Sequence, residues 1–379
     1  RDYYMFLVRS FYESKRCWEN LPNCLETQAM NKHKMCMTTP NVTDSDVFPW
    51  LDLAVRMVIK PGTSYVRQNI CPTYHAGIGA PCANGGTHGL CSPDWIPSPI
   101  SFGFIPNISK DYEEYCLRES YDSDVHVKYV ALPEPGKYRI ITVGEPWLYT
   151  GLRGIQKFLL DAWAKTPWST FVDNLPNHVI NRMKKGSGDY ISGDYSSATD
   201  LMHMDVTLYV VDSIMKNLGL TDSLLHERLY GSFARNWVEY PDGEVLRQVN
   251  GQLMGHPVSF PILCIINLAT YLMTKYEYDE SFLDENFLIT GLQDHKVLKS
   301  LTIDPIMING DDILFRGDQQ EYDTWRYCSS LVGLVVNEPK TYKNEEYCLI
   351  NSILTDMKTE KTIPYYHPSL AMGKKGGLE

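Results

Sequence analysis

The pattern of hydrophobic and polar positions is weak at the start of the chain and becomes regular after about residue 126. The first 127 residues are rich in proline, glycine, cysteine and asparagine, and residues 72–99 are predicted to form a long irregular loop. Residues 126–144 alternate around Pro135-Gly136, which predicts two strands joined by a turn. Residues 151–164 repeat apolar side chains at the spacing of a helix.

From residue 189 onwards, the predicted strands and helices follow an order that favours an α+β fold with an antiparallel sheet. Residues 189–194 form a predicted strand, and the next helix is expected to start at Ser196 or Ser197 and to end at Gly219. The later predicted elements are a helix over 221–233, a hairpin over 236–249, a helix over 256–276, a strand, turn and strand over 306–315, a helix over 319–333, a strand over 334–336, a loop over 337–341 and a strand pair over 346–357.

The composition and the net charge limit the possible folds and functions only slightly. The length of 379 residues allows one large core or two to three sub-domains. The net charge of −11, from 46 acidic and 35 basic residues, argues against a surface coated with positive charge, although it allows a local basic channel. The ten scattered cysteines are expected to be reduced thiols. Neither a signal peptide nor a membrane span is predicted, and the terminal sequences suggest a fragment of a longer protein.

Two adjacent acids, Asp311 and Asp312, interrupt an apolar stretch at residues 306–315. Gly310 permits a tight turn that would present both carboxylates at the rim of a sheet, where a hard cation such as Mg²⁺ could hold them. Phosphoryl transfer with two metal ions about 3.5–4 Å apart uses such a pair, together with a third acid. Asp194, at the end of the predicted strand 189–194, is the candidate for the third acid. An ordinary polar turn is the alternative interpretation.

Five segments together resemble the motifs of viral RNA-dependent RNA polymerases. They are EPGKYRIIT at 134–142 (motif F), SGDYSSATD at 192–200 (motif A), GQLMGHPVSFPILCIINLATY at 251–271 (motif B), INGDDILFRG at 308–317 (motif C) and GLVVNEPKTY at 333–342 (motif D). The sequences of these segments are most similar to those of the ourmiavirus-like branch, near the narnaviruses and the RNA-phage replicases. The resemblance covers about residues 126–357 and implies the palm and fingers of a right-hand polymerase.

The resemblance implies a role for each acid. Asp194 and Asp311 would bridge two Mg²⁺ or Mn²⁺ ions, with Asp312 as an outer ligand. Asp200 would sense the 2′-hydroxyl of the incoming nucleotide, because a carboxylate left without that hydroxyl loses a hydrogen bond. An acid in the first turn of a helix is also favoured by the helix dipole, and both roles are compatible.

Motif B supplies further candidates. Gly255 would let the loop move, and Ser259 stands where the family places a hydroxyl near the ribose. The commonest polymerases have asparagine four residues after that hydroxyl, whereas this chain has Leu263 there and Asn267 one helical turn later. Asn267 is therefore either a nucleotide contact or a buried polar residue bonded within its own helix.

Four basic residues complete the set. Lys137 and Arg139 alternate along the motif F strand and would clamp the triphosphate, with help from Lys128. Lys340 would be the general acid for the pyrophosphate leaving group. A solvated strand face and an ordinary surface lysine are the respective alternatives.

The resemblance also implies a domain plan and a biological setting. Residues 1–125 would form an N-terminal extension and fingers, 126–188 the fingers with motif F, 189–357 the palm with a fingers insertion at about 216–250, and 358–379 the start of a thumb or a tail. We expect a truncated thumb, because few residues follow the last strand pair. The implied partners are template RNA, product RNA and NTPs, in the replication of a positive-strand genome in the host cytoplasm.

Three other functions compete with this interpretation. A reverse transcriptase shares the palm, but usually has an aromatic residue before the paired acids and a bulky steric gate at the position of Asp200. A zinc-containing RNA-binding module is suggested by a loop whose spacing fits no standard zinc pattern: Cys71, His75, Cys82, His88 and Cys91. An inactive palm with a scaffolding role is the third, and the presence of every expected acid disfavours it.

Overall fold

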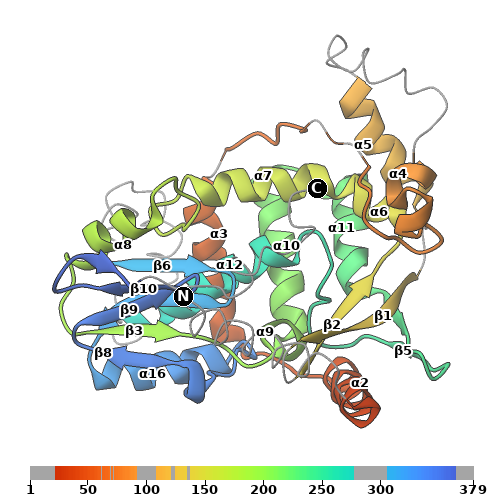
Figure 1. The fold of residues 1–379 in the computed structure, drawn as a ribbon. Helices are drawn as coiled ribbons and strands as arrows, with labels where there is room; N and C mark the ends of the chain where they lie inside the picture. Colours follow the sequence, from red (N-terminus) through yellow and green to blue (C-terminus); the bar gives the residue numbers. More distant parts are fainter. Residues whose placement is uncertain are drawn as a thin grey trace, which may run out of the picture.

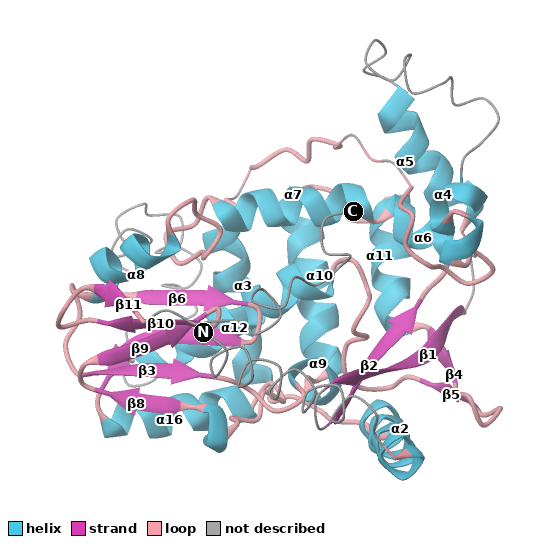
Figure 2. Ribbon diagram, in the orientation of Figure 1, coloured by secondary structure: helices cyan, strands magenta, loops and turns pink. Residues whose placement is uncertain are grey.

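The protein has a mixed α+β fold with three small sheets and helices between them (Figures 1 and 2). The computed structural model describes residues 22–60, 62–68, 70, 72–91, 108–120, 124–134, 137–276 and 305–363. The α+β class predicted from the order of elements is therefore confirmed. One continuous apolar core connects the helices to the sheets on both sides.

The sheet that carries the paired acids has the strand order β6-β7-β3-β8 and is antiparallel throughout. Its strands are β3 (Asp189–Gly193), β6 (Ile306–Asn309), β7 (Asp312–Gly317) and β8 (Tyr342–Asn344). Successive side chains alternate between its two faces. Ile308, Ile313 and Phe315 join the main core, whereas Met307 and Leu314 join a second apolar cluster. Both faces are therefore covered, which keeps the β6–β7 hairpin rigid.

A three-stranded sheet covers the second face and has the order β11-β10-β9. It consists of β9 (Tyr347–Ile350), β10 (Ile353–Asp356) and β11 (Lys361–Thr362), and the predicted final strand pair corresponds to β9 and β10. Helix α8 (Leu175–Met183) packs into the same cluster.

The third sheet, β2-β1-β4-β5, lies on the other side of the helices (Figure 1). It contains β1 (Val125–Glu134), β2 (Lys137–Val143), β4 (Asn236–Glu239) and β5 (Val245–Arg247). Both predicted hairpins are present as antiparallel pairs, although the Pro135-Gly136 turn lies outside the described residues. Strands β1 and β4 pair in parallel, so this sheet mixes parallel and antiparallel pairs.

Helix α12 (Ser259–Tyr276) is the central element of the core, and almost every side chain along it is buried. Its two prolines lie before the helix or in its first turn, as predicted, where a missing N–H is tolerated. The other helices are α2 (Asn23–Thr38), α3 (Phe48–Val58), α4 (Gly86–Cys91), α5 (Ile108–Glu119), α6 (Pro146–Gly151), α7 (Arg153–Ala164), α9 (Ala198–Leu201), α10 (Met204–Asn217), α11 (Leu224–Ala234) and α16 (Gln319–Ser330).

Three local predictions were wrong. The helix expected from Ser196 or Ser197 to Gly219 is broken into α9 and α10, because the His203 N–H donates to the Val332 carbonyl at 3.0 Å instead of continuing the helix. The strand expected over 334–336 is reduced to one isolated bridge between Tyr195 and Val336. The irregular loop expected over 72–99 contains the short helix α4, and residues 92–99 lie outside the described range.

A buried carboxyl on α5 gives the fold a pH dependence. The Glu113 side chain is 1 % exposed and accepts hydrogen bonds from the Tyr65 hydroxyl at 3.1 and 3.2 Å, with Arg67 Nε at 3.9 Å. Burial raises the pKa of Glu113 to about 7, above its ordinary value of 4.5. The folded state therefore holds a proton that the unfolded state has released between these two pH values.

The consequence is a loss of stability as the pH rises from about 4.5 through 7. We expect Glu113→Gln, which mimics the neutral carboxyl, to be more stable than the parent chain at pH 8 by about 2–3 kcal/mol, with the difference vanishing near pH 4. Urea unfolding at both pH values measures this difference. Glu114→Gln, on an adjacent and partly exposed side chain, is the matched control; equal behaviour of the two variants would contradict the assignment.

Candidate active site

The Gly310-Asp311 turn between β6 and β7 is held from behind by helix α12. Gly310 has φ of +67°, a left-handed backbone conformation that favours glycine. A Cβ atom added there would also lie 2.9 Å from the Phe260 ring, which leaves no room for a side chain. The Gly310 N–H donates to Cys264 Sγ at 3.2 Å, and the Gly310 carbonyl accepts from Asn267 Nδ2 at 2.9 Å. The position of Asp311 and Asp312 is therefore set by three side chains of one buried helix.

Asp194 follows β3 and comes beside the paired acids through the register of the sheet. Gly193, the last residue of β3, pairs with Ile313 on β7. Asp194, the residue after Gly193, therefore lies next to Asp312, the residue before Ile313. The charges of Asp194 and Asp311 act on one another and on Asp312. The structure thus brings together the three acids that the sequence singled out.

Burial and mutual repulsion disfavour negative charge at the paired acids. Burial, followed by the nearby Asp194 carboxylate, raises the pKa of Asp311. Burial, then Asp311 and Asp194, raises the pKa of Asp312 to about 6. Lys340 and Arg139 act in the opposite direction on Asp311. Such a set of carboxylates is stabilised by positive charge from outside the cluster.

Lys340 supplies one positive charge directly. It ends the short turn Glu338–Lys340, and its Nζ lies 3.2 Å from Asp194 Oδ2, although 62 % of the lysine side chain is exposed. Asn337 Nδ2 donates to the same oxygen at 3.2 Å, and the Asn337 N–H donates to the Asp194 carbonyl at 2.8 Å. The motif D loop is therefore tied to the end of the motif A strand.

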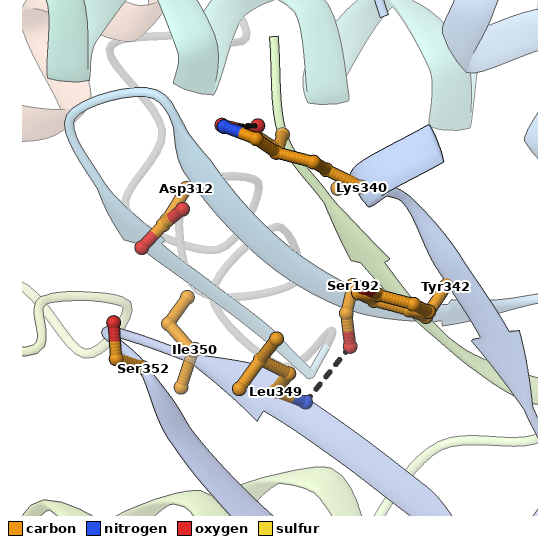
Figure 3. Close-up of a pocket in the computed structure, with 9 residues that line it drawn as sticks. Ser192, Asp312, Lys340, Tyr342, Leu349, Ile350 and Ser352 are labelled. Carbon is orange, nitrogen blue, oxygen red and sulfur yellow. Dashed lines mark hydrogen bonds and ion pairs between the residues drawn. The ribbon is translucent and has the colours of Figure 1, made fainter. Parts of the chain in front are cut away.

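A cavity of about 220 Å³ borders Asp194, Asp312 and Lys340 (Figure 3). Its remaining walls come from β3, β8, β9 and the β9–β10 turn, through Ser192, Gly193, Tyr342, Leu349, Ile350 and Ser352. Asp312 Oδ2 also accepts the Asn351 N–H at 3.2 Å, from the same turn. The carboxylates of Asp194 and Asp312 therefore border open space on one side.

The donor set fits a hard divalent cation in its chemistry, since three carboxylates that repel one another all offer oxygen. In the part of the chain that the structure describes, no three His, Cys, Asp or Glu side chains are gathered as tightly as a ready metal centre. Lys340 and Asn337 engage Asp194 Oδ2 instead. Metal binding would consequently require Lys340 to leave this oxygen.

Two cations of the motif F strand β2 pair with Glu134 at the end of β1. Arg139 Nε lies 2.5 Å from Glu134 Oε1, and Lys137 Nζ lies 3.5 Å from Glu134 Oε2, while both side chains remain about half exposed. The charge of Arg139 acts on Asp311. Glu134 thus holds both cations at the edge of the site, and Lys128 is exposed on the neighbouring strand β1.

Asp200 lies in the first turn of α9, and burial raises its pKa to about 6. The charge of Lys32 acts in the opposite direction, as does a hydrogen bond from Thr199. Ser197, three residues earlier, adopts a left-handed backbone with φ of 49°, which is uncommon for a side chain other than glycine. The Asp200 N–H donates to the carbonyl of this residue at 2.9 Å.

The motif B loop is docked between two neighbours. Gly255 has φ of +119°, and a Cβ atom there would lie 2.3 Å from the Thr142 carbonyl, while the Thr142 N–H donates to the Met254 carbonyl at 2.7 Å. Ser259 is buried, and its Oγ donates to Gln252 Oε1 at 2.5 Å. The loop is therefore attached to the motif F strand in this conformation.

Asn267 is fully buried and bonds across the core. Its Nδ2 donates to the Gly310 carbonyl, and its Oδ1 accepts from the Tyr195 hydroxyl at 2.9 Å. Both ends of its amide are thus occupied by motif C and motif A. It does not bond to the previous turn of its own helix in this arrangement, and it joins the two segments that carry the acids.

Comparison with known proteins agrees with these motifs. No protein-family model matches the chain. Over 267 residues, 63% of this chain, it is 31% identical to the RNA-dependent RNA polymerase of Ourmia melon virus (isolate Melon/Iran/VE9). Over 184 residues, 48% of this chain, it is 25% identical to the RNA-directed RNA polymerase of Saccharomyces 20S RNA narnavirus. The chain is therefore similar in sequence to two viral RNA-dependent RNA polymerases.

The predicted resemblance to the ourmiavirus-like branch is thereby confirmed. The chain spans 29% of the length of the first relative and 20% of the second. Within its described residues, no helix combines the length and the apolar character needed to cross a bilayer.

Several residues that shape the candidate site were not predicted from the sequence. Tyr195 directly follows Asp194, and Asn337 lies three residues before Lys340, and this proximity in the chain was the only available signal. Lys32 gave no signal, because it lies 165 positions from its partner Ser197. Long-range contacts of this kind have no local pattern.

Among the described residues, the cysteine-rich loop does not bring together a set of side chains that could hold a metal ion. His75 and Cys82 are exposed, and His88 stacks on Tyr74 with ring centroids 5.0 Å apart. Cys71 lies outside the described residues, as does the side chain of Cys91.

Proposed function

We propose that this chain carries the catalytic region of a viral RNA-dependent RNA polymerase, with the sheet β6-β7-β3-β8 as the palm floor and the sheet β2-β1-β4-β5 in the fingers. The proposed boundaries are those of the motif pattern: 1–125 and 126–188 for the extension and fingers, 189–357 for the palm, and 358–379 for the start of a thumb or a tail. The reaction is the template-directed transfer of NMP from NTP to the 3′-hydroxyl of RNA.

The observation that carries this proposal is the convergence of Asp194 with the Asp311-Asp312 pair at one end of a rigid sheet. These acids come from segments far apart in the chain. A structural role gives no reason for three repelling carboxylates at one place, because each disfavours the charge of the others. A site for divalent cations does give such a reason.

Asp194, Asp311 and Asp312 would hold two Mg²⁺ or Mn²⁺ ions, which when bound activate the attacking hydroxyl and stabilise the leaving oxygen. The chain itself contributes position and charge. Lys137 and Arg139 would leave Glu134 to bind the triphosphate oxygens, with the arginine donating in bidentate fashion.

Lys340 has two roles in this proposal. In the absence of metal, it neutralises Asp194 at 3.2 Å. With metal and NTP bound, its exposed side chain would be released and would donate a proton to the pyrophosphate leaving group.

Selection of the sugar would depend on Asp200, whose carboxylate accepts the 2′-hydroxyl of an NTP and loses that bond with a dNTP. Ser259 would contribute from the motif B helix once the Gly251–Gly255 loop has moved, since its hydroxyl now bonds to Gln252. Asn267 would act through the turn that it holds. The proposed partners are template and product RNA, and the proposed setting is replication of a positive-strand genome in the host cytoplasm.

Incubation of the chain with a primed RNA template, Mg²⁺ and labelled nucleotides tests the function. We expect template-dependent incorporation of NTPs, with a preference over dNTPs of at least about 100-fold in kcat/KM. A preference for dNTPs would favour a reverse transcriptase instead. Failure to extend RNA with either substrate, at any metal concentration, would overturn the proposal.

A further inference from the structure

Helix α2, which precedes every predicted polymerase motif in the chain, packs against α9, which carries Asp200, and against strands β2 and β5. The Met37 carbonyl at its end accepts the N–H groups of Val249 and Asn250 at 2.8 and 3.2 Å, directly before the motif B loop. A Cβ atom added to Gly251 would lie 2.5 Å from Met37 Cε and 2.8 Å from the Asp200 carbonyl. The helix therefore touches motifs A and B at the same point.

Two further contacts fix the rotation of α2. His33 is buried, and its Nδ1 lies 2.9 Å from the Tyr240 hydroxyl. Lys34 Nζ lies 4.9 Å from the centroid of the same Tyr240 ring and pairs with Asp242 and with Glu244, the latter at 2.7 Å. These contacts leave Lys32 pointing to the motif A turn.

Lys32 Nζ donates to Ser197 Oγ at 3.2 Å. Ser197 is the residue with the left-handed backbone, and its carbonyl accepts the Asp200 N–H at 2.9 Å. Lys32 thus bonds to the turn that orients Asp200, and its charge acts on the Asp200 carboxyl. Lys32 is itself exposed, so this contact lies at the solvent-facing edge of the turn.

We propose that Lys32 is a positioning residue for sugar selection, which holds the Ser197 turn and keeps the Asp200 carboxylate charged and directed at the ribose. This inference rests on the proposed function, and it extends the nucleotide site to the N-terminal segment. Asp200 also interacts electrostatically with Cys36 on α2, Tyr129 on β1 and Tyr240 after β4. It accepts a hydrogen bond from Thr199 on α9.

The contact between Lys32 and the Asp200 turn predicts how the preference for ribonucleotides depends on pH. Burial raises the pKa of Asp200 and Lys32 lowers it. Removal of the Lys32 ammonium group should therefore raise the pKa of Asp200 further. As the pH falls, Asp200 then becomes protonated earlier, and the preference for a ribonucleotide is lost at a higher pH than in the parent chain. A lysine that only stabilised the fold would not move this titration.

The test is calorimetric titration of the full chain with ATP and with dATP in the presence of Mg²⁺, over pH 5 to 8, so that it does not depend on turnover. We expect Lys32→Ala to reduce the ATP-to-dATP affinity ratio by about tenfold and to shift its pH midpoint upward. Lys32→Arg should restore both. Asp200→Asn should abolish the ratio and its pH dependence.

Lys34→Ala is the matched control, because Lys34 lies on the same helix but pairs with the β4–β5 hairpin. An unchanged ratio and midpoint in Lys32→Ala would overturn the inference, as would an equal change in Lys34→Ala. Failure of the parent chain to bind either nucleotide would overturn both the inference and the proposed function. If the parent chain prefers ATP but never extends RNA, only the proposed function fails.

Discussion

Replacement of Asp311 by asparagine is expected to reduce nucleotide incorporation by at least about 1,000-fold while leaving the fold intact. The side chain keeps its shape, but the amide can no longer contribute negative charge to a divalent cation. Because burial and the neighbouring Asp194 already raise the pKa of this carboxyl, loss of its charge should not destabilise the chain. Single-nucleotide extension of a primed RNA template measures the rate, and thermal unfolding measures the fold.

Asp323→Asn is the matched control for this variant. Asp323 is exposed on helix α16 and pairs loosely with Arg326 at 3.8 Å, so its loss should leave the rate within about twofold. Normal extension by Asp311→Asn would remove the acid cluster from the mechanism. Asp311→Ala should be equally inactive, since the effect arises from charge and not from shape.

Replacement of Asn267 by alanine should lower the free energy of unfolding by about 2–4 kcal/mol and should also reduce kcat. The side chain has no exposed surface, and its loss leaves the Gly310 carbonyl and the Tyr195 hydroxyl without one partner each. Because Gly310 begins the turn that carries Asp311, its release lets the carboxylates drift from their positions. Urea unfolding and steady-state extension rates measure the two effects.

The same variant separates the two roles considered for Asn267. A positioning role through the Gly310 turn predicts a lower kcat with an unchanged ratio of NTP to dNTP incorporation. A direct nucleotide contact predicts a change in that ratio. Asn177→Ala, at an exposed position of helix α8, is the control and should change stability by no more than about 0.5 kcal/mol. Equal stability of the two variants would contradict the bonding described for Asn267.

Much of the local structure could be predicted because it is encoded by neighbouring residues. Gly310 allows the tight turn of the β6–β7 hairpin, and the alternating apolar residues around it supply both faces of the sheet. The apolar stretch of α12 and its early prolines predicted its helical state and its start. Asp194 and Asp311 were identified in the same way, since each follows a strand of the predicted sheet.

The elements that were missed depend on partners distant in the chain. The break between α9 and α10 arises from the bond of His203 to Val332, and the parallel pairing of β1 with β4 joins segments about a hundred residues apart. Helix α2 shows no strong apolar stripe, because it is held by hydrogen bonds and by a few buried side chains such as Met37. Its sequence therefore gave no indication that it reaches the site.

The amino-acid sequence by itself determined the strands, the turn and the identity of the acids, because these follow from periods of two and of about 3.6 residues and from the conformational freedom of one glycine. Only the tertiary structure decided which side chains meet. Asn267 proved to be a buried support of the motif C turn, and Lys32 proved to be a neighbour of Asp200, because packing and charge act through space over distances that the order of residues does not record.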